Sequence, residues 1–413
     1  LPKNPRLSNI KWSPDQTMIA FTNTTSEGVE LWVLDLEKVK LKKLTPPKLN
    51  ANLGNVINWF KDSKSLLVKF VPPKTEAIKM TEDLVPSGPR ISTNDGAKAQ
   101  NRTYQDLLKN KNDEKNFEIL ALSELYKVSI KGSKRLWKKR DMYRNINFSP
   151  DGRFVLITTI KRPFSYLVPY YRFPSTYTIY GSTGKQVAVL ADIPLIEDLP
   201  KGFMSVRKGA RSFSWRLDKP ASIYFVSALD GGDPQVESEF RDELFQIDAP
   251  FNADPSSLLK TKNRYYKSLW CNDTLAIVSD YWWNNRNEKT YLFNPSNPQD
   301  GSMILSDRNY QDRYNDPGSF VKERNNFGEN ILALRNNSLY LIGDGFTSKG
   351  QFPFLDKLDL STMAKNRLYK SNIKGKKESL RDYSPNENQL FVRIESASEY
   401  PNYYFRELDA DLN

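Results

Sequence analysis

The sequence of 413 residues carries 61 Lys and Arg against 49 Asp and Glu, which gives a formal net charge of +12. It contains no histidine, which excludes a Ser-His-Asp triad, a Cys-His pair and any histidine-ligated metal within the chain. The single cysteine, Cys271, cannot form an intrachain disulfide, so the fold must rest on its core. No run of 18 apolar residues is present, and we therefore expect no transmembrane helix.

The positive charge is spread along the chain, apart from short runs such as Lys131–Arg140 and Lys374–Lys377. Nucleic-acid-binding proteins more often cluster their charge on one helix or arm, so we expect no nucleic-acid partner. Because both runs flank strand-like segments, exposed loop charge is the simplest interpretation. A polyanion-binding surface is a weaker alternative, which a steep fall of heparin or DNA affinity with salt would support.

A motif recurs from the start of the chain: an apolar residue, a Trp or Phe, a polar turn and a short apolar strand. The first copy comprises Ile10–Asp15 (IKWSPD), Met18–Phe21, a turn at Gly28, Glu30–Asp35 and Leu41–Thr45. Pro fixes φ in the Ser-Pro-Asp turn and Asp bonds its own backbone, which suits a tight link between strands. Four short strands within about 40 residues match the period of one propeller blade.

Six further copies of this motif follow at uneven spacing. They open at Val56–Trp59, Ile146–Gly152, Phe213–Trp215, Leu269–Trp270, Ile331–Leu334 and Tyr383–Asn386. A short apolar strand follows each opening. Seven openings predict an all-β fold, a seven-bladed β-propeller with four antiparallel strands in each blade, formed as a single domain by residues 1–413.

The longest interval follows the second copy and predicts an insertion in the second blade. Residues 72–117 are rich in Pro, Gly and Lys, and Thr103–Leu108 has a briefly helical pattern. We therefore predict a long irregular and partly helical insertion here, with little helix elsewhere. A loop of this length inside a compact domain is usually functional or mobile.

The central stretch Lys201–Pro234 carries the most unusual chemistry of the chain. Arg207, Arg211 and Arg216 fall within ten residues of one another. Between them, Ser212–Trp215 alternates polar and aromatic residues, as a strand with one buried face does.

Four aspartates in segments rich in turn-forming residues are candidates for a metal site. Asp230, Asp233, Asp307 and Asp312 do not form a D-x-D-x-D-G loop, so we expect them to cap turns rather than to bind calcium. We expect no metal and no cofactor.

The last copy of the motif is shorter than the others. It supplies three clear strands, around Leu380–Tyr383, Gln389–Glu395 and Tyr403–Leu408. A closed propeller needs its last blade completed, so we predict that the edge beside Tyr403–Leu408 is either open or filled by another polypeptide. The chain also begins at Leu1 without an initiator methionine, which indicates a piece of a longer precursor.

The text SVRKGARSFSWR (Ser205–Arg216) followed by ALDGGDP (Ala228–Pro234) resembles the glutamyl endopeptidase branch of the prolyl oligopeptidase family of serine peptidases. Further matches occur in fixed order at Val85–Asn110, Tyr170–Tyr180, Asp307–Ser319, Pro353–Leu360 and Glu395–Leu408. Members of this family join a β-propeller to an α/β-hydrolase domain that holds the catalytic Ser, Asp and His. The resemblance here is to the propeller alone. It implies that this chain holds no catalytic residue and that its partner is the hydrolase domain of the same precursor.

The resemblance also implies a role in substrate access and recognition, because the family's propeller caps the active site and admits short or unfolded peptides. A glutamyl-specific enzyme must bind a carboxylate, which the planar guanidinium of arginine does through two hydrogen bonds. The resemblance therefore points to four substrate-binding candidates: Arg172, Arg207, Arg211 and Arg216. Arg216 follows a buried-looking tryptophan and could instead pair with Asp218 or Asp233.

Two functions from different classes follow from these observations. The first is the N-terminal propeller of a glutamyl endopeptidase-like serine peptidase, which gates access and contributes to recognition of acidic peptide substrates. The second is a stand-alone propeller that binds a protein or peptide partner without catalysis. A hydrolase domain after Asn413 would favour the first and a stop codon there the second. The single cysteine and the Lys- and Asn-rich text lead us to expect a periplasmic or otherwise exported bacterial protein.

Overall fold

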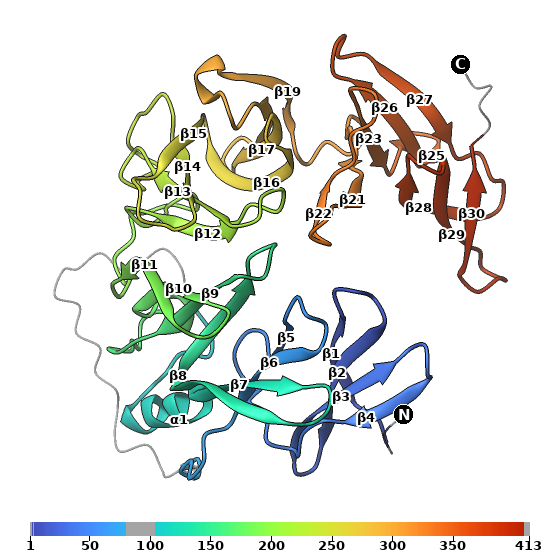
Figure 1. The fold of residues 1–413 in the computed structure, drawn as a ribbon. Coiled ribbons are helices and arrows are strands. Elements are labelled where there is room, and N and C mark those ends of the chain that lie inside the picture. The colour runs from blue at the N-terminus through green and yellow to red at the C-terminus, as the bar shows by residue number, and fades with distance from the viewer. Residues whose placement is uncertain (1, 3, 80–103, 409–413) are drawn as a thin grey trace. The chain divides into compact units, whose positions relative to one another are not determined.

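The computed structural model describes residues 2, 4–79 and 104–408 of the chain. This described part contains thirty β-strands, one α-helix and two short 3-10 helices (Figure 1). The chain divides into two compact units, each described below by itself. One consists of Leu1–Ala210, Gly232–Gln235 and Ile247–Asp254, and the other of Arg211–Gly231, Val236–Gln246 and Pro255–Asn413.

The first sheet of the first unit contains four consecutive antiparallel strands. They are β1 (Leu7–Trp12), β2 (Met18–Thr25), β3 (Gly28–Asp35) and β4 (Lys40–Lys43). Ser13 and Asp15 form the turn between β1 and β2, where Ser13 Oγ donates to Asp15 Oδ1 at 2.6 Å and the amide of Met18 donates to Ser13 Oγ at 3.0 Å. The inner strands bury Ala20, Leu31 and Val33 in a core shared with β5 and β6.

A seven-stranded antiparallel sheet completes the first unit. Its strands pair in chain order: β5 (Ile57–Trp59), β6 (Ser65–Phe70), β7 (Ser123–Ser129), β8 (Lys134–Phe148), β9 (Phe154–Ile160), β10 (Ser175–Gly181) and β11 (Gln186–Ile193). The first part of β8, up to Asp141, pairs with β7, and the remainder from Met142 pairs with β9. This 15-residue strand therefore joins what the sequence predicted as the second and third blades.

The α-helix of the described part, α1 (Lys111–Ala121), lies at the end of the predicted insertion. The Asn110 side chain caps its first turn by accepting from the amides of Asn112 and Asp113, each at 2.9 Å. The prediction of a helix at 103–108 is therefore wrong in position, because the described residues 104–108 are not helical and the capping residue comes later. The described part has no helix long and apolar enough to cross a membrane.

The apolar face of α1 packs on the loop that links β9 to β10. The ring of Phe117 lies 5.0 Å from that of Phe164 and 5.6 Å from that of Phe173, measured between centroids. The short 3-10 helix η1 (Tyr170–Arg172) lies in the same loop.

The second unit begins with two four-stranded antiparallel sheets. The first contains β12 (Arg211–Trp215), β13 (Ser222–Ala228), β14 (Asp242–Asp248) and β15 (Ser256–Thr261). The second contains β16 (Arg264–Asn272), β17 (Leu275–Trp282), β18 (Asn287–Phe293) and β19 (Ser302–Asn309), with the 3-10 helix η2 (Pro298–Asp300) before β19. Trp270 of β16 packs between them, with its ring centroid 5.2 Å from that of Tyr224.

The remaining strands form one more four-stranded sheet, two small hairpins and a terminal three-stranded sheet. The four-stranded sheet contains β20 (Ser319–Phe320), β23 (Ser338–Gly343), β26 (Phe354–Asp359) and β27 (Lys365–Lys370). The hairpins are β21 (Lys322–Arg324) with β22 (Asn330–Leu332), and β24 (Phe346–Thr347) with β25 (Gly350–Gln351). The terminal sheet contains β28 (Lys377–Ser384), β29 (Gln389–Glu395) and β30 (Asn402–Glu407).

The all-β propeller class predicted from the sequence is confirmed, since the larger sheets are antiparallel and built from strands consecutive or nearly consecutive in the chain, as propeller blades are. The predicted number of blades is wrong. The described residues form five blades rather than seven, counted as sheets of at least four strands. Strand β8 fuses two predicted blades into one sheet, and the last sheet stops at three strands. The single-domain organisation of residues 1–413 stays a prediction.

Candidate functional site

The first unit holds two of the four predicted arginines, Arg172 and Arg207. Arg172 ends the 3-10 helix η1, is buried, and lies with its guanidinium carbon 5.2 Å from the centroid of the Tyr104 ring. Arg207 is half-buried in the loop that precedes β12, and its Nη1 donates to the carbonyl of Lys208 at 2.8 Å.

The loop that carries Arg207 is held against the second half of the ALDGGDP motif. The amide of Val206 donates to the carbonyl of Gly232 at 3.0 Å. Gly232 has φ +85°, and a Cβ on it would lie 2.1 Å from the carbonyl oxygen of Val206. Only glycine allows this approach of the two backbones, so the two separated motifs are in direct contact and fix the start of the Arg207 loop.

The second unit holds the other two predicted arginines, and both are bound by protein groups. Arg211 forms an ion pair with Asp242. Arg216, whose side chain is only 1% exposed, donates through Nε to Asp218 Oδ1 at 3.1 Å and also bonds Gln246. The sequence alternative that Arg216 pairs with Asp218 is therefore confirmed.

Both arginines of the second unit connect β12 to β14 across the intervening strand β13. Arg211 begins β12 and reaches Asp242 at the start of β14, whereas Arg216 directly follows β12 and reaches Gln246 further along β14. Two strands that are not neighbours lie about 9.6 Å apart, so only a long side chain spans them. The guanidinium of Arg216 also lies 4.4 Å from the centroid of the Trp270 ring.

The alternation predicted for Ser212–Trp215 is interrupted by a β-bulge. Ser212 has φ +58°, and the pairing of β12 with β13 shifts between Arg211 and Ser214. The bulge leaves Ser212 exposed and Trp215 buried. It also adds one residue to β12, which places Arg211 and Arg216 on the same face of the sheet, where both reach β14.

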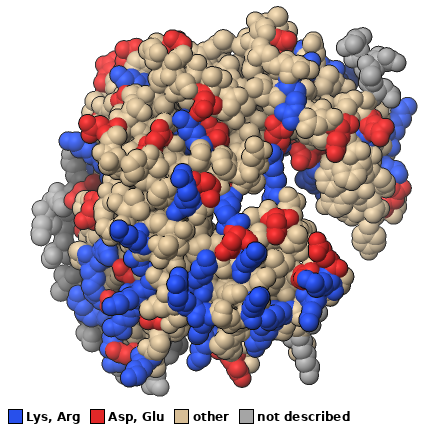
Figure 2. Space-filling model, viewed as in Figure 1, with Lys and Arg blue, Asp and Glu red and all other residues tan. Residues whose placement is uncertain are grey.

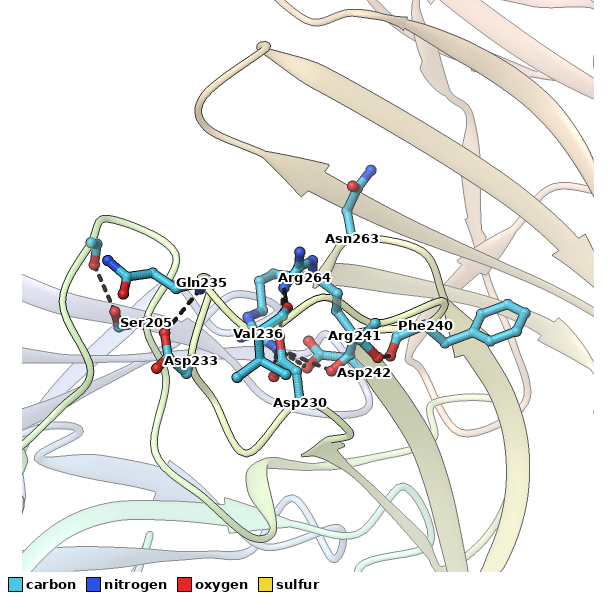
Figure 3. A network of polar contacts seen from close by, with 12 residues as sticks. Ser205, Asp230, Asp233, Gln235, Val236, Phe240, Arg241, Asp242, Asn263 and Arg264 are labelled. Carbon is cyan, nitrogen blue, oxygen red and sulfur yellow. Dashed lines mark hydrogen bonds and ion pairs between the residues drawn. The ribbon is translucent and has the colours of Figure 1, made fainter.

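Arg211 belongs to a larger buried network that the sequence did not predict. Figure 3 shows Asp230, Arg241, Asp242 and Arg264 of this network. Two buried carboxylates, those of Asp230 and Asp242, bind three guanidinium groups. Arg264 of β16 donates to both oxygens of Asp230 at 2.8 Å and to Asp242 Oδ1 at 3.1 Å. Arg241 donates to Asp230 Oδ2 at 2.8 Å.

The network is a structural joint between two sheets. Asp230 follows β13 and Asp242 begins β14, whereas Arg264 begins β16 of the next sheet. Burial raises the pKa of the Asp242 carboxyl, and the adjacent Arg211 and Arg264 guanidinium groups oppose that rise. Buried charges of this kind are tolerated only when paired, so each member holds the others in place.

The four aspartates expected to cap turns divide into two groups. Asp233 accepts from the amide of Gln235 at 2.9 Å and Asp312 from that of Tyr314 at 3.0 Å, as turn caps do. Asp230 instead binds two arginines of the network, and Asp307 forms an ion pair with Lys289.

The basic run Lys131–Arg140 lies mostly in a strand, so its interpretation as loop charge is wrong. From Lys134 onward it forms the first part of β8, with Lys134, Arg135 and Lys139 exposed. Figure 2 shows lysine and arginine side chains gathered over this part of the first unit. No turn residue interrupts the run after Lys134, which is why the strand continues through it.

The chain is similar in sequence to two plant proteins. A probable chloroplastic glutamyl endopeptidase of Oryza sativa subsp. japonica is 36% identical over 388 residues, which cover 90% of this chain and 41% of that protein. The corresponding protein of Arabidopsis thaliana is 33% identical over 389 residues, covering 90% of this chain and 40% of that protein. The chain thus spans about two fifths of the length of these curated relatives. No model of a protein family matches it.

Similarity to solved structures is weaker. An oligogalacturonate lyase in complex with manganese is 11% identical with a TM-score of 0.46, covering 97% of this chain and 88% of that one. The β-propeller domain of the Trilobed protease from Pyrococcus furiosus is 11% identical with a TM-score of 0.43, covering 100% of this chain and 95% of that one.

The predicted periplasmic or exported bacterial location is contradicted by the two sequence relatives, both of which are plant proteins named chloroplastic. Proteins of many compartments have a single cysteine and a composition rich in Lys and Asn, so these features could not identify the compartment. The similarity itself confirms the resemblance carried by the motifs, because it extends over 90% of the chain. Over nine tenths of its length, the chain is therefore related in sequence to part of two proteins named probable glutamyl endopeptidases.

Proposed function

We propose that this chain is the propeller portion of a glutamyl endopeptidase-like serine peptidase, whose catalytic α/β-hydrolase domain belongs to the same precursor. The observation that carries the proposal is the coverage: 90% of this chain matches only 41% of a probable glutamyl endopeptidase. A sequence without histidine cannot form a Ser-His-Asp triad, so catalysis requires a second domain. The propeller gates access to that domain and contributes to the recognition of acidic peptides.

Of the four candidate arginines, Arg207 is our principal candidate for contact with a substrate carboxylate. Arg211 and Arg216 already bind Asp242 and Asp218 in the interior, and we assign them a structural role. Arg207 is half-buried, and its loop is fixed in place by Gly232. A guanidinium presented from a fixed loop loses little entropy when it binds a carboxylate. Arg172 is the second candidate.

The sequence that follows Asn413 in the gene tests the proposal directly. A hydrolase domain with a G-x-S-x-G motif and a histidine supports it, whereas a stop codon at that point contradicts it and favours a stand-alone binding propeller. A gating role further predicts that the intact enzyme cleaves an unfolded peptide but leaves the same sequence uncut inside a stably folded domain. Equal cleavage of both forms would exclude gating.

A further inference from the structure

A cavity of about 290 Å³ lies in the second unit, and no described residue of the arginine network lines it. It is bounded by the sheet of β16–β19 on one side and by β20, β21, β23, β26 and β27 on the other. The volume lies close to the lower end of the ~300–1,000 Å³ range of small-molecule sites. One face of the lining is polar and the walls are apolar, and this difference in polarity indicates the kind of ligand that fits.

The register of the β16–β19 sheet gives the cavity a polar floor. Lys267 lies directly opposite Ser279, Ser279 opposite Thr290, and Thr290 opposite Ser306, so the four side chains form one row on one face. All four line the cavity. The row therefore places one ammonium group and three hydroxyl groups across four strands.

Two of these hydroxyls are buried and have hydrogen-bonding capacity to spare. Ser279 is 2% exposed and Thr290 is 8% exposed. Within the described residues, the only side-chain hydrogen bond of either is a long one of 3.3 Å between Ser279 Oγ and Thr290 Oγ1. Each hydroxyl can donate one hydrogen bond and accept two, so both can also bind a ligand atom in the cavity.

The walls of the cavity are apolar and come from both sheets. They comprise Leu269, Met303, Leu305, Phe320, Leu341, Leu358 and Met363. Leu341 and Leu358 are buried, whereas Met303 is almost half exposed. Such walls favour a ligand with a hydrocarbon body over one that is polar throughout.

The charged residues of the lining are mostly cationic. Lys267, Lys322 and Lys365 are exposed, and none forms an ion pair with another described residue. A fourth cation, Arg308, pairs with Asp316 at 3.3 Å and lies opposite Glu288, the only carboxylate among the described residues of the lining. The lining therefore carries an excess of positive charge, which favours an anion.

We propose that this cavity binds a small amphipathic carboxylate. Its anionic group is held by the ammonium group of Lys267 and the hydroxyls of Ser279 and Thr290, and its apolar body packs against Leu305, Phe320 and the other wall residues. A medium-chain fatty carboxylate and the free C-terminus of an apolar dipeptide share this chemistry. The described residues that line the cavity belong to the second unit and do not include Arg207, so the proposal does not depend on the proposed peptidase function.

Calorimetric titration of the intact protein tests the proposal with two pairs of probes. Octanoate is compared with octanamide, and N-acetyl-Leu-Leu with its C-terminal amide. We expect at least one carboxylate to bind about tenfold or more tightly than its neutral amide, as a charged hydrogen bond provides. A preference for octanoate over octanamide identifies a fatty carboxylate as the ligand. A preference for N-acetyl-Leu-Leu over its amide identifies the C-terminus of a peptide.

Lys267→Met should remove the preference for the carboxylate, and Thr290→Val should weaken carboxylate binding several-fold. Lys260→Met is the matched control, because Lys260 is an exposed lysine on β15 outside the cavity. Equal affinity for carboxylate and amide, or no binding of any probe at millimolar concentration, would overturn the proposal. So would a carboxylate preference that survives Lys267→Met as fully as it survives Lys260→Met.

Discussion

Arg264 binds Asp230 through two parallel hydrogen bonds of 2.8 Å, and both side chains are almost completely buried. Asp230 belongs to the ALDGGDP motif, which carries part of the resemblance to the glutamyl endopeptidases, and Arg264 begins the next sheet. The motif therefore serves the packing of two sheets, in addition to any role at a substrate site.

We predict that Arg264→Met strongly destabilises the second unit. It leaves the Asp230 carboxylate with one partner fewer in a dry interior, which typically costs about 3–5 kcal/mol. Urea unfolding of the variant measures the loss. The matched control is Lys38→Met, which removes the exposed ion pair with Asp35 and should leave the unfolding free energy almost unchanged, because water screens that pair. A similar small change for both variants would contradict the structural role of the network.

Lys69 provides a prediction about pH. Its side chain is buried and donates to the carbonyl of Leu53, and burial lowers its pKa to about 8 from 10.5 in the unfolded chain. Below pH 8 the lysine is charged in both states and its burial costs stability. Between pH 8 and 10.5 the unfolded chain binds more protons than the folded one, so stability rises with pH.

We therefore predict that Lys69→Met is stabilised relative to the parent at pH 7, by an amount on the order of 3 kcal/mol if the whole shift is realised. The advantage should shrink as pH rises from 8 toward 10.5. Denaturant unfolding of both proteins at several pH values measures it. A stability difference that stays constant over this range would contradict a lowered pKa for Lys69.

Alanine substitutions at two adjacent glycines distinguish the effect of backbone strain from the effect of moving the Arg207 loop. Gly232→Ala places a Cβ 2.1 Å from the Val206 carbonyl oxygen, so the loop must move. Gly231→Ala also has positive φ, but its Cβ has no neighbour within 4 Å among the described residues. We predict that both variants lose some stability from strain, on the order of 1 kcal/mol. Only Gly232→Ala should also reduce cleavage of acidic peptides by the intact enzyme.

The terminal sheet gives a prediction about its edge. The described residues place three strands there, as the sequence predicted, and none pairs with the outer edge of β30. Tyr403 and Phe405 are 58% and 69% exposed on this strand. We predict that a strand from another segment or polypeptide covers this edge in the intact protein, because open apolar edges promote association.

Hydrogen exchange of the intact protein checks this prediction. The amides of β30 should then exchange as slowly as those of β29. Rapid exchange of the outward-facing amides of β30, in a protein that remains monomeric, would show that the edge is open.

Much of the fold could be predicted from short patterns because the turns are local. The serine and aspartate of the Ser-Pro-Asp turns bond each other as expected, at 2.6 Å for both Ser13–Asp15 and Ser149–Asp151. The continuity of β8 could not be predicted, since a strand that changes partners at Asp141 keeps the same residue pattern on both sides. This continuity, together with a last sheet of only three strands, is why the predicted blade count was wrong.

The candidate site was predictable only in part. The sequence brought Arg207, Arg211 and Arg216 together as neighbours, but the partner of Arg211 is Asp242, 31 positions away. A contact over that distance is set by the pairing of β12, β13 and β14 and leaves no local signal. The cavity proposed above likewise depends on register, which places Ser279 and Thr290 side by side.

The most direct test of the account is the ratio of kcat/KM for peptides with Glu and with Gln before the scissile bond, measured on the full-length enzyme carrying Arg207→Ala. Loss of one bidentate contact should lower kcat/KM for the Glu peptide about ten- to a hundred-fold and leave the Gln peptide nearly unchanged. Lys208→Ala, an exposed neighbour, should keep the parental ratio. A Glu-to-Gln ratio in Arg207→Ala equal to that of the parent would contradict the account and place the specificity outside this propeller.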